Sequence, residues 1–246
     1  MSKMTNKTIF LNIWSMFLIL LTYAQDNNLK TQIQLLQGSP AYKYPLDSTG
    51  FAIIKNAKFF TKSGNTDMFN INRTNIHVVD FNTDGEKDII YQENSHYTAT
   101  VLLVKKGDDF IEIWNGPGAL VDIKHGEKIS IYIRSNAVGC MYETMLSELS
   151  IKNDNSFTEN IVSIHSETEL NKINKTLKRK TISGILRTQP IIDDTKKTEP
   201  CTGDLIIGNQ LRKIENQEVT VIKKQNKWLL VVVEEKSQSI IGWVKK

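Results

Sequence analysis

The sequence KISIYIR, residues 128–134, alternates apolar and polar side chains. Because a strand points successive side chains to opposite faces of a sheet, Ile129, Ile131 and Ile133 are expected to share one buried face. EVTVIKK, residues 218–224, begins with the same alternation. The runs DIIYQ, TVLLV and FIEIW are rich in β-branched and aromatic residues and are bounded by Gly, Asn and Asp. These patterns predict a mainly β protein.

The composition is that of an ordinary globular protein. The chain has 246 residues, of which 24% are charged and 40% are hydrophobic, enough for one large domain or two small ones. Its formal net charge is +4, and two of these charges, Lys3 and Lys7, lie among the first 24 residues, which have the pattern of an export signal described below. Subtracting these two from +4 leaves +2, which gives no electrostatic reason to expect a nucleic-acid partner.

The first residues have the pattern of an export signal. Lys3 and Lys7 precede the apolar stretch IFLNIWSMFLILL, residues 9–21, and TYA ends at Ala24. This three-part pattern predicts a cleaved signal peptide over residues 1–24. The alternative is a membrane anchor, but the apolar stretch is shorter than the ~20 residues that a spanning helix needs. We therefore expect a secreted or periplasmic protein with no membrane span after cleavage.

One segment is expected to be helical. SETELNKINKTLKRK, residues 166–180, opens with Ser166, and Glu169 follows three positions later, the spacing of a capping box. Leu170, Ile173 and Leu177 then recur at helical spacing. The segment also contains Lys172, Lys175, Lys178, Arg179 and Lys180. These cations indicate either a patch for an anionic surface or a solvated helix face, and we favour the solvated face.

The helical segment predicts how the chain is divided. Residues 25–165 are expected to form a β domain, residues 166–180 a basic helical linker, and residues 181–246 a second β domain. Within the first domain, KNDNS, residues 152–156, separates two β-rich runs and predicts a hairpin turn.

An acidic loop, DFNTDGEKDI over residues 80–89, is the strongest candidate for a site. Its carboxylate and amide side chains surround Gly85, which permits a tight turn. Several hard oxygen donors converging on one point suit Ca²⁺, whereas the nitrogen and sulfur ligands of zinc or copper are missing from the loop. The expected ligands are the side chains of Asp80, Asn82, Asp84 and Asp88 and a backbone carbonyl near Glu86. The alternative is an Asx-rich turn without an ion.

The first half of this loop matches an EF-hand, but Tyr91 stands where the EF-hand has its bidentate Glu, and the flanking runs are strands. The pattern D-x-N-x-D-G-x-x-D between two strands resembles the calcium loop of FG-GAP or VCBS repeats. The resemblance covers about residues 75–113 in a single copy. It implies a propeller-blade-like hairpin that binds Ca²⁺ in an exported protein.

The C-terminal region resembles a bacterial SH3-like domain. The matching positions are Arg187, Trp228, Gly242, Trp243 and Val244. The resemblance implies a small β-barrel that serves as a binding or targeting module, often toward cell-wall peptides. Trp243 is then a candidate ligand-binding residue, with core packing as the alternative. Two departures concern the ligand groove: the family's Gly before the central strand is Gln217, and IDDTKKTEPCTGD lengthens the first loop.

The two cysteines, Cys140 and Cys201, leave several roles open. They can form a disulfide in an oxidising compartment, serve as buried small hydrophobes, or provide a nucleophile in Cys140 with His165 or His125 as base. No catalytic signature surrounds Cys140, so an enzyme is not expected.

The sequence therefore predicts an exported, non-catalytic, calcium-stabilised binding protein of the cell envelope. Its expected partner is a cell-wall peptide or another envelope protein. The alternatives are a cell-wall hydrolase that uses Cys140 and a structural or interaction partner of another envelope protein.

Overall fold

The computed structural model describes residues 27–38, 59–60, 76–93, 98–126, 129–137, 139, 142–152, 154, 156–170, 172–174 and 176–246. The predicted signal peptide, residues 1–24, lies outside the described residues. In the described part of the chain, no helix is long and apolar enough to cross a membrane.

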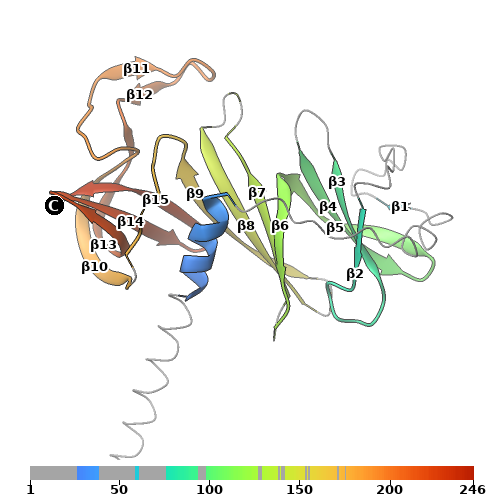
Figure 1. The fold of residues 1–246 in the computed structure, drawn as a ribbon. Helices are drawn as coiled ribbons and strands as arrows, with labels where there is room; N and C mark the ends of the chain where they lie inside the picture. Colours follow the sequence, from blue (N-terminus) through green and yellow to red (C-terminus); the bar gives the residue numbers. More distant parts are fainter. Residues whose placement is uncertain are drawn as a thin grey trace, which may run out of the picture.

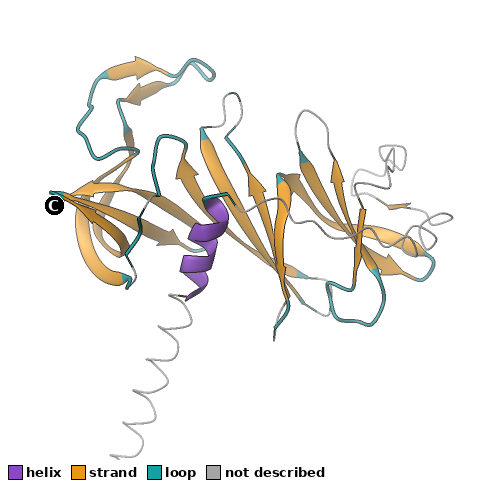
Figure 2. Cartoon of the chain, viewed as in Figure 1, coloured by secondary structure: helices purple, strands orange, loops and turns teal. Residues whose placement is uncertain are grey.

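The protein is mainly β, as predicted (Figures 1 and 2). The strands are β1 (Phe59–Phe60), β2 (Ile76–Val79), β3 (Asp88–Glu93), β4 (Ala99–Lys106), β5 (Asp109–Pro117), β6 (Ala119–Lys124), β7 (Ile129–Ser135), β8 (Glu143–Ile151), β9 (Phe157–His165), β10 (Lys178–Arg187), β11 (Lys196–Thr198), β12 (Leu205–Ile207), β13 (Gln210–Gln225), β14 (Trp228–Glu235) and β15 (Gln238–Lys245). They form a five-stranded sheet in the order β1-β5-β4-β3-β2, an eight-stranded sheet in the order β10-β13-β14-β15-β9-β8-β7-β6, and a two-stranded sheet of β11 and β12.

The five-stranded sheet and strands β6–β8 enclose one apolar core. Ile129, Ile131 and Ile133 are all buried in it, so the alternation in β7 has the predicted effect. The predicted turn at residues 152–156 joins β8 to β9, which pair antiparallel. The other buried members of this core include Phe81, Ile90, Leu102, Val104, Trp114, Leu120 and Leu149.

A second core lies on the other side of the eight-stranded sheet, beneath the helix at residues 27–36 (Figure 2). The helix contributes Ile33 and Leu36 to this core. The side-chain amide of Gln32 donates a 2.7 Å hydrogen bond to the carboxylate of Glu148, a buried residue of β8. Apolar contact and this polar contact together hold the helix against the sheet.

The predicted boundary near residue 180 lies inside strand β10. Strand β15 pairs with β14 on one edge and runs parallel to β9 on the other, with Ile241 opposite Ile164. The C-terminal strands and β6–β9 therefore belong to one continuous sheet. Strand β10 meets β15 through a single residue pair, Arg187 with Trp243, and the strands do not form a closed barrel.

The predicted helix over residues 166–180 is wrong. The described part of this segment is irregular, and Lys178 already begins strand β10. Leu170 and Leu177 are both buried in the second core. The described chain between them crosses this core without forming a helix, so their helical spacing is not used by a helix. The hydroxyl of Thr168 donates to the carbonyl of Thr188 at 2.7 Å. Because a short isolated helix is only marginally stable, such tertiary contacts override the local preference.

Candidate functional site

The acidic loop connects antiparallel strands β2 and β3, as the sequence predicted. Its turn is held by its own polar side chains. The Asp84 carboxylate accepts hydrogen bonds from the Asn82 side-chain amide at 2.7 Å and from the backbone N–H of Glu86 at 2.8 Å. The Asp80 carboxylate accepts one from the backbone N–H of Gly85 at 3.0 Å. Gly85 has a φ of 91°, which a side chain would strain.

The side chain of Asp88 connects the acidic loop to the neighbouring strand. It is fully buried, and its two carboxylate oxygens accept hydrogen bonds from the backbone N–H groups of Phe81 at 3.2 Å and Lys105 at 3.0 Å. Burial raises the pKa of Asp88 to about 7, and the nearby charges of Asp84 and Asp80 act in the same direction. Asp88 therefore ties the loop to β4.

The loop partly fits a calcium ion. One carboxylate oxygen of Asp80, Oδ1, is buried and accepts no hydrogen bond from the part of the chain that the structure describes. Glu86, by contrast, forms an ion pair with Lys105. Among the described residues, no group of three or more His, Cys, Asp or Glu side chains is gathered closely enough to hold a metal. The predicted ligands thus share one loop, but the carboxylate of Asp88 is directed to the backbone N–H groups of Phe81 and Lys105.

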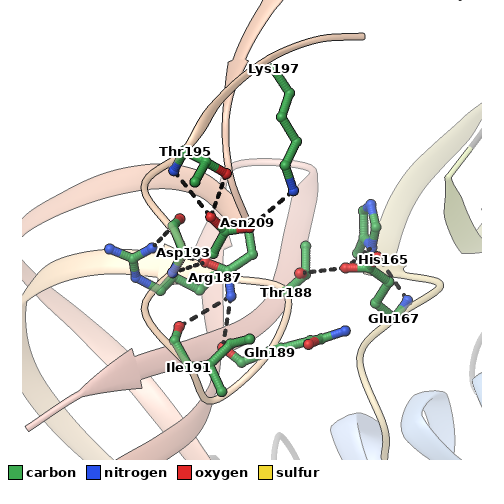
Figure 3. A network of polar contacts seen from close by, with 10 residues as sticks. All are labelled: His165, Glu167, Arg187, Thr188, Gln189, Ile191, Asp193, Thr195, Lys197 and Asn209. Atoms are coloured by element: carbon green, nitrogen blue, oxygen red, sulfur yellow. Dashed lines mark hydrogen bonds and ion pairs between the residues drawn. The ribbon is translucent and has the colours of Figure 1, made fainter. Parts of the chain in front are cut away.

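A second site is built on Arg187, at the end of β10 (Figure 3). This buried guanidinium donates hydrogen bonds to the carbonyl of Asp193 at 3.0 Å, the side-chain oxygen of Asn209 at 2.8 Å and the carboxylate of Asp194 at 2.7 Å. These partners lie at both ends of the segment 190–209, which contains β11 and β12. We call this segment the hairpin.

Further contacts fix the base of the hairpin. The side-chain amide of Asn209 donates to the carbonyls of Gln189 at 3.3 Å and Ile191 at 3.1 Å. Gly208 has a φ of 48°, and a Cβ there would lie 2.0 Å from the carbonyl oxygen of Asp193. Hydrogen bonds from Thr195 and Lys197 lower the pKa of Asp193 to about 2. The base is therefore an ordered polar network.

The hairpin is also attached to the start of β8. Glu199 accepts a 3.0 Å hydrogen bond from the hydroxyl of Tyr142 and others from the backbone N–H groups of Cys201 and Thr202. These bonds lower the pKa of the Glu199 carboxyl. Cys201 is disulfide-bonded, and the chain's other cysteine, Cys140, lies outside the described residues.

The hairpin projects from the body of the protein (Figure 1), and several of its apolar side chains are exposed to solvent. We call these residues the hairpin patch: Ile191, Ile192, Leu205, Ile206 and Ile207, which are 38–67% exposed. Among the described strands, β11 and β12 pair only with each other, so each has an edge that no described strand covers. Exposed apolar side chains beside an open strand edge are typical of a protein-binding surface.

A cavity of about 450 Å³ lies where the hairpin meets the body. In it, the ring of His165 stacks on Tyr142 with centroids 6.0 Å apart. His165, one of the two predicted bases for Cys140, thus faces an aromatic ring. The other predicted base, His125, is exposed just beyond the end of β6. The cavity is also lined by Glu143, Glu167, Lys197, Glu199, Ile206 and Leu211.

The prediction that Trp243 binds a ligand at the surface is wrong. Trp243 is 2% exposed and belongs to the second core with Leu230 and Ile241. Its ring also lies 5.6 Å from the ammonium of Lys223. The physical reason is that helix 27–36 and the segment after β9 cover the face of β15 that an isolated barrel would expose to solvent.

The sequence predicts the hairpin only as a lengthened loop, and it marks Arg187 only as a position shared with SH3-like domains. Two signals were available: the apolar run LII at residues 205–207, bounded by polar residues and Gly208, and the paired acids at Asp193 and Asp194. Neither signal indicated that Arg187, Asn209 and these acids meet. No family model, curated protein or solved structure matches the chain.

Proposed function

We propose that the protein is an exported, non-catalytic binding protein of the cell envelope and that the hairpin patch contacts its partner. The observation that carries the proposal is the exposure of five apolar side chains on a hairpin that is fixed at its base by Arg187 and near its tip by Glu199. A pre-ordered binding element loses little conformational entropy when it binds, which favours affinity.

Another envelope protein is the partner class that the hairpin favours over a cell-wall peptide. The most exposed residue, Leu205, is 67% exposed and lies in β12, opposite Thr198 of β11. Aliphatic side chains fit an apolar surface, and an open strand edge can accept a partner strand through main-chain hydrogen bonds. Sugars and short charged peptides match this surface less well.

Site-specific photocrosslinking of the full chain in its native cells tests this proposal. With p-benzoylphenylalanine in place of Leu205, we expect one discrete protein adduct. The same probe in place of Lys106, an exposed residue at the end of β4, serves as the control and should give none. Adding Ile192→Ser and Ile207→Ser should reduce the Leu205 adduct by about fivefold or more, the effect of losing apolar anchors.

The outcomes separate the candidate partners. An adduct that persists undiminished in the double serine variant would mean that the hairpin patch is not the contact surface. Co-sedimentation with purified cell-wall sacculi, without any adduct, would favour the wall-peptide alternative. The hydrolase alternative depends on Cys140, which lies outside the described residues, and Cys140→Ser assayed on peptidoglycan tests it.

We further propose that Ca²⁺ binds the acidic loop and stabilises the fold. The buried, unpartnered Oδ1 of Asp80 and the side-chain oxygens of Asn82 and Asp84 in the same turn support this proposal. A bound cation would offset the repulsion among the loop's aspartates. We also propose two detailed fold assignments. The acidic loop and its flanking strands form a propeller-blade-like hairpin, and β10 with β13–β15 has an SH3-like arrangement.

Thermal unfolding with and without Ca²⁺ tests the metal proposal. At a Kd of ~0.1 mM and ~1 mM free Ca²⁺, binding should stabilise the fold by about 1.4 kcal/mol. Asp84→Ala should abolish this calcium-dependent increase, whereas Asp108→Ala, at an exposed acid in the turn between β4 and β5, should retain it. An Asx turn without an ion predicts no calcium dependence in any variant, and that result would exclude the metal.

A further inference from the structure

A second cavity, of about 590 Å³, lies beside the start of β10 and the end of β13, away from both the hairpin and the acidic loop. Its apolar residues are Val221 and Leu229, buried members of the apolar cluster between β10, β13, β14 and β15. The remaining lining residues are polar or cationic. We call this cavity the lysine pocket, and its polar lining residues are Asn174, Thr176, Lys178, Lys180, Lys224 and Lys246.

Strand geometry brings the lysines together. Lys178 and Lys180 are two positions apart on β10, so they lie on the same face of that strand. Arg179, between them, pairs instead with Glu218 at 3.2 Å. Lys178 lies opposite Val221 and Lys224 opposite Leu229 in the antiparallel ladders. The pairing of β10, β13 and β14 thus places cations from distant positions in the sequence around one apolar floor.

The lysine pocket concentrates positive charge. Its described lining includes four lysines and no Asp or Glu. A hydrogen bond with Lys224, together with burial and the positive charges of Lys224 and Lys180, lowers the pKa of Lys246. Like charges around an apolar concavity focus the electrostatic field on it and raise the local concentration of anions.

We propose that the lysine pocket binds a small phosphate-bearing anion. A phosphate group matches several ammonium groups because each of its oxygens accepts charge-assisted hydrogen bonds. The hydroxyl of Thr176 and the amide of Asn174 line the same cavity and are neutral donors for the remaining oxygens. A soluble phosphorylated glycan and the headgroup of an anionic lipid share this chemistry.

Calorimetric titration of the full chain with inorganic pyrophosphate tests the proposal. We expect saturable binding that weakens as salt rises from about 50 to about 200 mM, because the contacts are ionic. Replacing two pocket lysines, Lys180→Gln with Lys224→Gln, should lower the affinity by about tenfold or more. The control, Lys106→Gln with Lys152→Gln, removes the same charge at exposed lysines of β4 and the β8–β9 turn and should keep the affinity within about twofold.

Each result decides the proposal. Equal losses of affinity in the two double variants would mean that pyrophosphate binding depends only on the net charge of the protein, and the proposal would be rejected. Binding to phosphatidylglycerol vesicles without any binding of pyrophosphate would also reject it, in favour of a membrane surface. If pyrophosphate binds, vesicle flotation identifies the source of the phosphate. A protein that binds a lipid headgroup should float with phosphatidylglycerol vesicles but not with phosphatidylcholine vesicles. A protein that binds a soluble anion should float with neither.

Discussion

Arg187→Ala is expected to lower the free energy of unfolding by about 3 kcal/mol and to release the base of the hairpin. The Arg187 side chain is 6% exposed and holds Asp194, Asn209 and the carbonyl of Asp193 through hydrogen bonds of 2.7–3.0 Å. Removing the guanidinium leaves the buried side-chain oxygen of Asn209 and the carbonyl of Asp193 without this donor, whereas the carboxylate of Asp194, whose side chain is 52% exposed, can be solvated. Removal of a buried hydrogen-bonded charge is costly for this reason, and the lost packing of its aliphatic stem adds to the effect.

Urea unfolding gives the stability change, and amide hydrogen exchange over residues 190–209 reports the hairpin directly. The matched control is Arg179→Ala on the same strand, because Arg179 pairs with Glu218 at the surface. That exposed ion pair should contribute about 0.5 kcal/mol. Similar losses in the two variants, or unchanged exchange in the hairpin after Arg187→Ala, would contradict the role assigned to the Arg187 network. The hairpin-patch proposal depends on this rigidity, so photocrosslinking at Leu205 should weaken in the same variant.

Asp88→Ala is expected to destabilise the protein by about 3 kcal/mol, independently of calcium. Asp88 is fully buried and accepts the backbone N–H groups of Phe81 and Lys105. Alanine would leave both donors unsatisfied next to an apolar core, and each unsatisfied buried group costs roughly 1–3 kcal/mol. Phe81, itself completely buried, should lose its fixed position as well.

Unfolding measured in the presence of a chelator isolates this structural role from metal binding. Asp108→Ala, which removes an exposed acid from the turn that follows β4, should change stability by less than about 0.5 kcal/mol. Asp88→Asn keeps one acceptor oxygen and should lose about half as much stability as the alanine variant. If Asp88→Ala were destabilising only when Ca²⁺ is present, Asp88 would be a metal ligand rather than a link between the loop and β4.

The sequence alone determined the features that depend on neighbours along the chain. Alternation with period two places Ile129, Ile131 and Ile133 in one core, and the polar run at residues 152–156 forms the turn between β8 and β9. The glycine-centred acidic loop lies between two strands for the same reason: its turn is closed by side chains within the loop. These interactions span a few residues, so a local pattern is sufficient to specify them.

Contacts between distant segments decided the rest. Leu170 and Leu177 have helical spacing, but the core beneath helix 27–36 accepts them from an extended chain. Trp243 is buried because that same core covers β15, whose parallel pairing with β9 also joins the two predicted domains in one sheet. Local patterns carry no information on which distant segment will supply a partner.

The candidate sites divide in the same way. The sequence predicted where the acidic loop lies. Only the folded chain brings Asp88 to the backbone N–H groups of Phe81 and Lys105, which are 24 residues apart in the sequence. The sequence pointed to some of the residues of the Arg187 network and the lysine pocket, such as Lys178 and Lys180, but did not predict that they meet, because each site gathers side chains from strands and loops far apart along the chain. Burial and strand pairing, which are collective properties of the whole fold, determine whether such charges are paired, exposed or concentrated in one cavity.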